Sequence, residues 1–246
     1  MFVLAVVLGA GHDPARRETW FTVGRLKREM ALFGLASGRQ VDHLVARLCS
    51  VGFLAAQRAP EDRRVRILQP TEAMLAHDRD WLAAHHVGLA HLCPENDYGL
   101  ALNGDPDFQL AHRRIAPAFL PLSAKALTAV PETLFFLDRA AGPLVLAALL
   151  QAALAEPDGV HAAVPYADVG ARFGVSRTHV RELLVAAAAR GLMRLHGRGG
   201  HRVEILPALW SGYDRSIATG MYLLDMIYAV LTNRRPDTGR RPIAAD

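Results

Sequence analysis

The chain has 246 residues, a formal net charge of +4 and a sequence pI near 9.4. A hydrophobic fraction of 51% is enough for one large domain or two small ones, and it argues against bulk disorder. The two cysteines, Cys49 and Cys93, offer no disulfide framework and are typical of a reduced, cytoplasmic protein. Residues 1–10 lack the basic start of a signal peptide, and no apolar run is long enough to span a bilayer. We therefore expect a soluble cytoplasmic protein without a membrane partner.

The segment 1–70 predicts three helices and a β-hairpin rich in arginine. In the third helix, Val41, Leu44 and Val45 recur at helical spacing, which indicates one buried face. Polar residues at its start are expected to stay exposed. The helices are expected at residues 1–10, 22–33 and 38–51, and the hairpin carries Arg58, Arg63, Arg64 and Arg66.

Residues 71–155 predict a helical connector. Its first helix is long and carries apolar anchors such as Trp81 and Leu89. A stretch rich in Gly, Asn, Asp and Pro then indicates a loop, and later prolines separate shorter helices. The expected elements are helices at residues 72–93, 108–119, 123–130, 131–141 and 142–155, with the loop at residues 94–106.

Residues 156–207 predict a second helical unit with a hairpin. Gly174 supplies the left-handed backbone of a tight turn, and Ser176 is a good N-cap for the next helix. Gly191 ends that helix, and the hairpin tip over residues 197–200 carries Arg198. The expected elements are helices at residues 166–173, 177–190 and 213–232, strands at residues 192–196 and 202–206, and a basic tail over residues 234–246.

The two hairpin-bearing units align as an internal repeat. When Ser37 is placed under Ser176, Gly52 falls under Gly191. After one deletion, residues 64–68 align with residues 202–206. Upstream, residues 3–8 are similar to residues 145–150, although chance similarity between two Ala/Leu/Val runs is the alternative. If this match is real, residues 1–10 form a buried helix, and the first copy lacks a counterpart of residues 132–141.

Each copy resembles a known family of regulators. The segment FGVSRTHVRELLVAAAARGL, followed by GRGGHRV, resembles the winged-helix DNA-binding domain of GntR-type regulators, with His179 where that family often has Pro. The segment LASGRQVDHLVARLCSVGFLAAQRAPEDRRVRILQPTEAM resembles the core of MarR-type regulators, with departures at residues 38–40 and 69–71. The MarR resemblance implies that Arg64 enters the minor groove and that Asp62 holds the wing in shape.

These observations predict a mainly α fold with small β-wings. Two winged helix-turn-helix units lie in one chain, joined by a helical connector, in the manner of a fused MarR-type pseudo-dimer. By the same resemblance, the helices at residues 72–93 and 213–232 should pack as the dimerisation pair. The expected segments are residues 1–70 and 156–207 for the two units, residues 71–155 for the connector and pseudo-dimerisation region, and residues 208–246 for the C-terminal helix and tail.

Basic charge is concentrated in the two copies. Residues 13–66 carry +5 and residues 172–202 carry +6, so the remainder carries −7. A polar, basic helix start beside a basic hairpin suits the grooves of duplex DNA. We expect a sequence-specific transcriptional regulator, a repressor that occludes its promoter. The expected DNA contacts are Ser37, Arg39, Gln40, His43, Arg63, Arg64, Ser176, Arg177, Thr178, His179, Arg181 and Arg198.

Other functions remain open at this point. A tandem winged-helix replication initiator also pairs two unlike winged domains, and a winged-helix scaffold would contact protein alone. Enzymatic activity is not expected, because the sequence has no phosphate loop, no GxSxG elbow and no HExxH motif. We expect no cofactor, and either a monomeric pseudo-dimer or a homodimer.

Two small-ligand hypotheses concern the connector. The cluster of His77, His85, His86, His91 and Cys93 matches no standard zinc spacing, so we expect interface histidines and no metal. MarR-type regulators often hold a small-molecule effector beside the dimerisation helices, although aromatic residues are more often simply core. The aromatic residues that could line such a pocket are Trp20, Trp81, Phe108, Phe119, Phe135 and Phe136.

Overall fold

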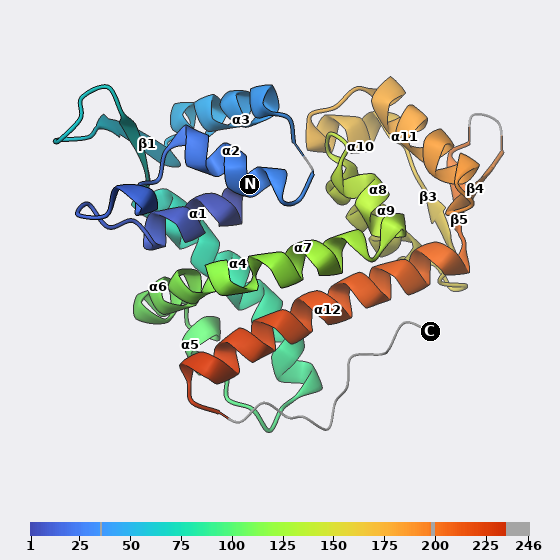
Figure 1. The fold of residues 1–246 in the computed structure, drawn as a ribbon. Coiled ribbons are helices and arrows are strands. Elements are labelled where there is room, and N and C mark those ends of the chain that lie inside the picture. The colour runs from blue at the N-terminus through green and yellow to red at the C-terminus, as the bar shows by residue number, and fades with distance from the viewer. Residues whose placement is uncertain (35, 198–199, 235–246) are drawn as a thin grey trace. The chain divides into compact units, whose positions relative to one another are not determined.

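The computed structural model describes residues 1–34, 36–197 and 200–234. Over these ranges the fold is mainly helical with two small antiparallel sheets, as the sequence predicts (Figure 1). It divides into two compact units, Met1–Lys125 with Thr219–Asp246, and Ala126–Ala218. None of the helices in the described ranges is both long and apolar enough to cross a membrane.

The first unit begins with three helices and a hairpin. Its elements up to the hairpin are α1 (Phe2–Ala10), the 3-10 turn η1 (Arg17–Thr19), α2 (Val23–Ala31), α3 (Gly38–Ser50), β1 (Leu54–Arg58) and β2 (Arg66–Pro70). After the hairpin come α4 (Glu72–Leu92), α5 (Gly99–Leu102), α6 (Pro106–Ile115) and the 3-10 turn η2 (Ala116–Phe119).

The second unit contains the larger sheet. Its elements are α8 (Pro131–Leu137), α9 (Gly142–Ala155), β3 (His161–Ala163), α10 (Tyr166–Phe173), α11 (Arg177–Ala189), β4 (Met193–His196) and β5 (Arg202–Ile205). Two further helices, α7 (Leu120–Thr128) and α12 (Pro207–Leu231), carry residues of both units.

The core of the first unit is built around α1. Leu4, Val6 and Leu8 are buried, and they share one apolar cluster with Phe21 and Val41. The expected buried helix at residues 1–10 is therefore confirmed. Because nearly all of α1 is apolar, burying it removes a large nonpolar area from water, which is the main driving force for folding this unit.

The long helix α4 packs against the part of α12 that lies in the first unit. Leu82 and Leu89 of α4 share a core with Leu224 and Tyr228 of α12. The helices approach closely at Gly88, where an added Cβ would lie 2.9 Å from the Met221 methyl carbon. The expected pairing of the two flanking helices is confirmed for this part of α12.

A buried ion pair joins α4 to α6. Asp78 accepts bonds from Arg113 at 2.8 and 2.9 Å and from Gln109 at 2.8 Å, and all three residues are buried. Beside it, His112 is 1% exposed, and burial together with the Arg113 charge lowers the pKa of His112 to about 3. Burial also lowers the pKa of His86. The unit therefore holds two neutral histidines that a lower pH would charge.

In the second unit, α9, α10 and α11 pack on a sheet with the strand order β3-β5-β4 (Figure 1). Leu149, Leu184 and Val203 are almost fully buried in its core. Gly174 ends α10 with a φ of 69°, as the turn requires. Gly170 allows the turn to fold back closely, because a Cβ there would lie 2.6 Å from the carbonyl oxygen of Val175.

Several expected elements need correction. The loop expected at residues 94–106 contains α5, and α12 begins at Pro207 instead of residue 213. Strand β3 was not expected, and α9 belongs to the second unit rather than to the connector, because its buried face packs in that unit's core. Of the tail expected at residues 234–246, Arg234 is described and pairs with Asp225, whereas residues 235–246 lie outside the described residues.

The alignment of the two hairpins was also wrong. Leu54 pairs with Pro70, and the matching Met193 pairs with Ile205. Ile205 therefore corresponds to Pro70, whereas the sequence alignment matched it with Ile67, and the first hairpin is longer than the second. The error has a physical origin: apolar and charged residues alternate in both strands, and such a pattern specifies register weakly when the loop lengths differ.

Candidate nucleic-acid interface

The clearest repeated feature is the start of α3 and of α11. Both helices have 13 residues, and each begins directly after a serine, Ser37 or Ser176. The Oγ of Ser37 accepts a hydrogen bond from the backbone N–H of Gln40 at 3.3 Å, and the Oγ of Ser176 accepts one from His179 at 3.0 Å. Both serines have a φ of −71°. The N-cap expected at Ser176 is confirmed, and Ser37 caps its helix in the same way, so the two serines fix where each helix begins.

Each of these helices buries one face and exposes the other. Val41 of α3 and the aligned Val180 of α11 are 1% and 0% exposed. One turn later the prediction of a buried Leu44 was wrong, because Leu44 is 39% exposed whereas the aligned Leu183 is 3% exposed. The exposed side chains at the two helix starts are Ser37, Arg39, Gln40 and His43 in the first unit, and Ser176, Arg177, Thr178 and Arg181 in the second.

Besides the two capping serines, Gln40 and His179 among the expected contact residues use side-chain atoms within their own unit. The Oε1 of Gln40 accepts a hydrogen bond from the backbone N–H of Ser37 at 2.7 Å, which completes a capping box. His179 is half-buried, and its Nε2 donates to the carbonyl oxygen of Ala140 at 2.8 Å. Gln40 keeps its amide N–H groups for a ligand, whereas the ring of His179 is held against its own unit.

The elements around α3 and α11 follow the same order. In the second unit, the order α9-β3-α10-α11-β4-β5-α12 places β5 between β3 and β4. The first unit has the order α1-α2-α3-β1-β2-α4. In place of a strand equivalent to β3, the segment before α2 lies against β2, where Leu68 donates its backbone N–H to the carbonyl oxygen of Phe21 at 2.7 Å. The backbone hydrogen bond at the open end of each hairpin also matches. Thr71 N–H donates to the carbonyl oxygen of Phe53 at 3.0 Å, and Leu206 N–H donates to that of Leu192 at 3.1 Å.

The first hairpin is held in shape by Asp62. Its Oδ1 accepts the backbone N–H of Arg64 at 3.1 Å, and its Oδ2 accepts from the Arg17 guanidinium at 2.9 Å. The expected structural role of Asp62 agrees with these contacts. Within the described part of the chain, Arg63 and Arg64 are exposed and make no ion pair or side-chain hydrogen bond. Their guanidinium groups are free to meet a phosphate or a base.

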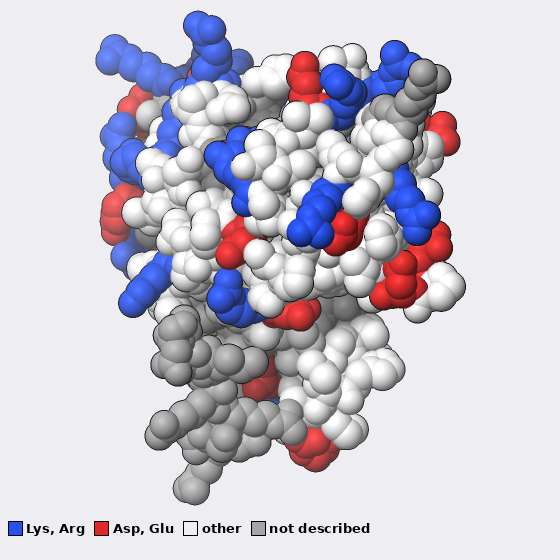
Figure 2. Space-filling model, turned by 90° about the vertical axis from the view of Figure 1, so that its right-hand side faces the viewer, with Lys and Arg blue, Asp and Glu red and all other residues white. Residues whose placement is uncertain are grey.

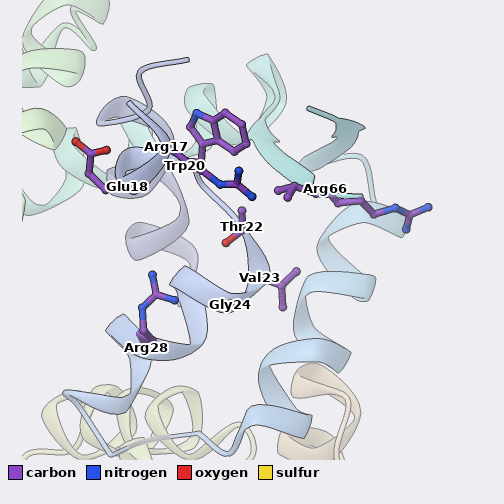
Figure 3. A pocket seen from close by; sticks show the side chains of 9 residues that line it. Arg17, Glu18, Trp20, Thr22, Val23, Gly24, Arg28 and Arg66 are labelled. Atoms are coloured by element: carbon purple, nitrogen blue, oxygen red, sulfur yellow. The ribbon is translucent and has the colours of Figure 1, made fainter. Parts of the chain in front are cut away.

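A basic groove lies beside this hairpin. It has a volume of about 410 Å³, and Figure 3 shows Arg17 and Trp20 on one side, with Arg66 extending outward from β2. The Arg17 guanidinium lies 5.4 Å from the centre of the Trp20 ring. The groove is lined by Arg17, Glu18, Trp20, Thr22, Val23, Gly24, Arg28, Val65 and Arg66.

The second hairpin is organised around Glu204. This residue accepts from Arg194 at 2.9 Å with one oxygen, and its other oxygen lies 2.9 Å from His196 Nε2. The bond from His196 lowers the pKa of Glu204. Arg202 is exposed on β5. Arg198, the expected contact at the hairpin tip, lies outside the described residues.

The charged side chains do not merge into one positive surface. On the face shown in Figure 2, Lys and Arg side chains are separated by acidic and uncharged ones.

The expected effector residues are not brought together. Trp20 packs with Ala59 and Ile67, and Phe135 and Phe136 lie in the core of the second unit. Trp81 and Phe108 belong to the core that α4 and α12 share. These aromatic residues are therefore core components of separate clusters. An effector stays a prediction, but this set of residues does not form its pocket.

The connector histidines also stay apart. The Nδ1 atoms of His85, His86 and His91 each pair with a backbone carbonyl one helical turn earlier, and His86 is buried. The ring of His77 stacks on that of Phe53 and contacts Phe2 edge-to-face. Among the described residues, the group of side chains that could hold a metal is a different one, His161, His196 and Glu204. No sequence motif pointed to this group, because its three residues lie on three strands.

No protein-family model matches the chain, and no curated protein or solved structure matches it.

Proposed function

We propose that the chain is a cytoplasmic, sequence-specific DNA-binding regulator with two unlike winged-helix units. The observation that carries the proposal is the repetition of one local design, in which a serine-capped helix of 13 residues precedes an antiparallel hairpin with arginines. A helix of this kind can enter the major groove with its first turn, and the hairpin can contact the backbone or the minor groove. A winged helix is also the interpretation that the strand order of the second unit supports best.

Electrostatics supports DNA over a protein partner. The two helix starts expose Arg39, Arg177 and Arg181, and the first hairpin exposes Arg63 and Arg64. Within the described residues these five guanidinium groups have no carboxylate partner. Because their charge is uncompensated, an adjacent polyanion gains attraction without breaking ion pairs, and releases counterions. A scaffold that binds neutral protein surfaces has no use for this arrangement.

The two units would read different sequences. At aligned positions, Arg39 of α3 corresponds to Thr178 of α11, and Asp42 corresponds to Arg181. Asp42 is neutralised by Lys27 at 2.7 Å, whereas Arg181 is exposed and positive. Side chains with different donors and acceptors select different base edges. We therefore propose an asymmetric operator, and repression by occupation of that DNA without any catalytic step.

The test is direct binding of the full chain to a fluorescent duplex of random sequence at several salt concentrations. The proposal predicts binding whose affinity falls steeply as salt rises, since each phosphate contact contributes to the slope of log K against log salt. The matched ligand is a fluorescent acidic peptide of equal charge. Equal affinity for the peptide and the duplex would contradict DNA as the partner and favour the scaffold.

A further inference from the structure

Three potential metal ligands meet on one face of the second sheet. His161 lies on β3, Glu204 lies opposite it on the neighbouring β5, and His196 lies on β4, two residues from the partner of Glu204. One ligand atom from each residue lies within 4.8 Å of the other two. Because side chains alternate between the two faces along a strand, these three side chains lie on the same face of the sheet. Glu204 lies on the central strand β5, so its carboxylate is next to a histidine from each of the neighbouring strands, β3 and β4.

We propose that His161, His196 and Glu204 form a binding site for a divalent transition-metal ion of the Zn²⁺ class. Two imidazole nitrogens and one carboxylate oxygen are a ligand set of zinc and of similar first-row ions, whereas Mg²⁺ and Ca²⁺ prefer oxygen alone. The side chains are 31%, 44% and 20% exposed, so an ion can reach them from solvent. A water molecule would take the fourth position, as in other three-ligand sites.

A carboxylate behind His161 supports the assignment. The Nδ1 of His161 donates to the Oδ2 of Asp158 at 2.8 Å, and this leaves Nε2 free as the ligand atom. Asp158 is itself fixed, because its Oδ1 accepts the backbone N–H groups of Val160 and His161 at 2.9 and 3.0 Å. Metal-binding histidines almost always donate their second nitrogen to such an acceptor, which sets the tautomer and orients the ring.

The geometry needs a small contraction on binding. Three atoms bound to one tetrahedral ion at about 2.1 Å lie roughly 3.4 Å apart, which is less than the present upper limit of 4.8 Å. His196 Nε2 and Glu204 Oε2 already lie 2.9 Å apart, so the remaining contraction would be between His161 and this pair. Binding through Nε2 of His196 would require the proton in its hydrogen bond to Glu204 to pass to solvent or to Nδ1 of the same ring, and Arg194 would stay on the second oxygen of Glu204.

Metal binding would link all three strands of this sheet. At present β3 is joined to β5 over the pairs from His161↔Glu204 to Ala163↔Arg202. A bound ion would add a bond between β3 and both strands of the hairpin. Because the unfolded chain lacks the assembled site, the binding free energy adds to the stability of the folded unit.

The experiment uses the full chain, first stripped of metal with a chelator and then titrated with Zn²⁺ in a calorimeter. The proposal predicts one site per chain and a rise in the melting temperature that follows occupancy. His161→Ala and His196→Ala should each lose this site, and Asp158→Asn should weaken it by about 10-fold or more. The control is His91→Ala, which removes an exposed histidine of α4 and should leave binding unchanged.

A second measurement avoids variants that fold poorly. In the wild-type chain, added Co²⁺ should shift or broaden the ring proton resonances of His161 and His196 before those of the other histidines. Absence of Zn²⁺ uptake by the wild-type chain would overturn the proposal. So would full retention of the site in His161→Ala and His196→Ala, or a Co²⁺ effect confined to the connector histidines.

Discussion

The carboxylate of Asp62 accepts the backbone N–H of Arg64 at 3.1 Å, so the residue that shapes the first hairpin and the residue expected to read DNA are coupled. Asp62 also accepts a hydrogen bond from the Arg17 guanidinium at 2.9 Å, which links the hairpin to η1. The side chain of Arg64 stays exposed. The hairpin is therefore preorganised by one acidic residue, and its guanidinium groups are left for a partner.

This coupling predicts a change in DNA affinity opposite to the one expected from charge alone. Asp62→Ala removes a negative charge, which by itself should tighten DNA binding, yet we expect weaker binding because the hairpin loses its fixed shape. The affinity should fall several-fold in an anisotropy titration at constant salt. The matched control is Glu61→Ala, which removes the same charge from the neighbouring exposed residue and should leave the affinity equal or higher. Tighter binding by both variants would contradict the role assigned to Asp62.

Removal of the hairpin arginines should weaken DNA binding directly. We expect Arg64→Ala and Arg198→Ala each to cost about 1–3 kcal/mol, which is the range for groove-reading arginines. A suitable control is Arg114→Ala, because Arg114 is exposed on α6, outside the proposed interface. Unchanged affinity in both hairpin variants would contradict the model of two DNA-reading units.

The cap of α11 allows stability and DNA binding to be separated. Ser176→Ala removes the acceptor for the His179 N–H, so the free energy of unfolding should fall by about 1 kcal/mol. Ser176→Asp keeps a cap and should retain stability, but it places a negative charge at the proposed interface. Denaturant unfolding and DNA titration of both variants check this. If Ser176→Asp binds DNA as well as wild type does, the start of α11 does not contact DNA.

The buried histidine of the first unit predicts a pH dependence of stability. The pKa of His112 is lowered to about 3 in the folded chain from an ordinary value of 6.5, so between these values the unfolded chain binds more protons. The free energy of unfolding should therefore fall as pH decreases below about 6.5, by up to about 1.4 kcal/mol per pH unit from this residue. His86 acts in the same direction.

Denaturant unfolding between pH 6.5 and 4.5 measures this slope above the range in which most carboxylates titrate. His112→Gln keeps a polar side chain of similar length but cannot take up the proton, so its stability should depend less on pH. An equal slope in wild type and His112→Gln would show that His112 does not carry the effect.

Local signals predicted the helices well because their causes are local. The apolar spacing of Val180 and Leu184, the cap at Ser176 and the glycine turn at Gly174 all act within a few residues, and the structure places α10 and α11 accordingly. The same holds for α9, whose expected bounds agree with the observed ones. Local propensity and tertiary packing agree at these positions.

Features that depend on distant partners were not predictable. Strand β3 has three residues, and it is a strand only because β5 pairs with it. The Asp78–Arg113 ion pair joins residues 35 positions apart on two helices, and no pattern in the sequence of either helix predicts it. In the candidate interface, the exposed charges were predicted, but the intramolecular partner of His179 was not, because it depends on where Ala140 lies.

The central claim is that one chain reads DNA with two unlike units. Selection of bound fragments from a random duplex pool at physiological salt, followed by sequencing, tests it most directly. The account predicts that each enriched sequence contains two dissimilar half-sites at a constant spacing, and that Arg64→Ala relaxes one of them while Arg198→Ala relaxes the other. Recovery of a simple palindrome, or of no enriched sequence at all, would contradict it.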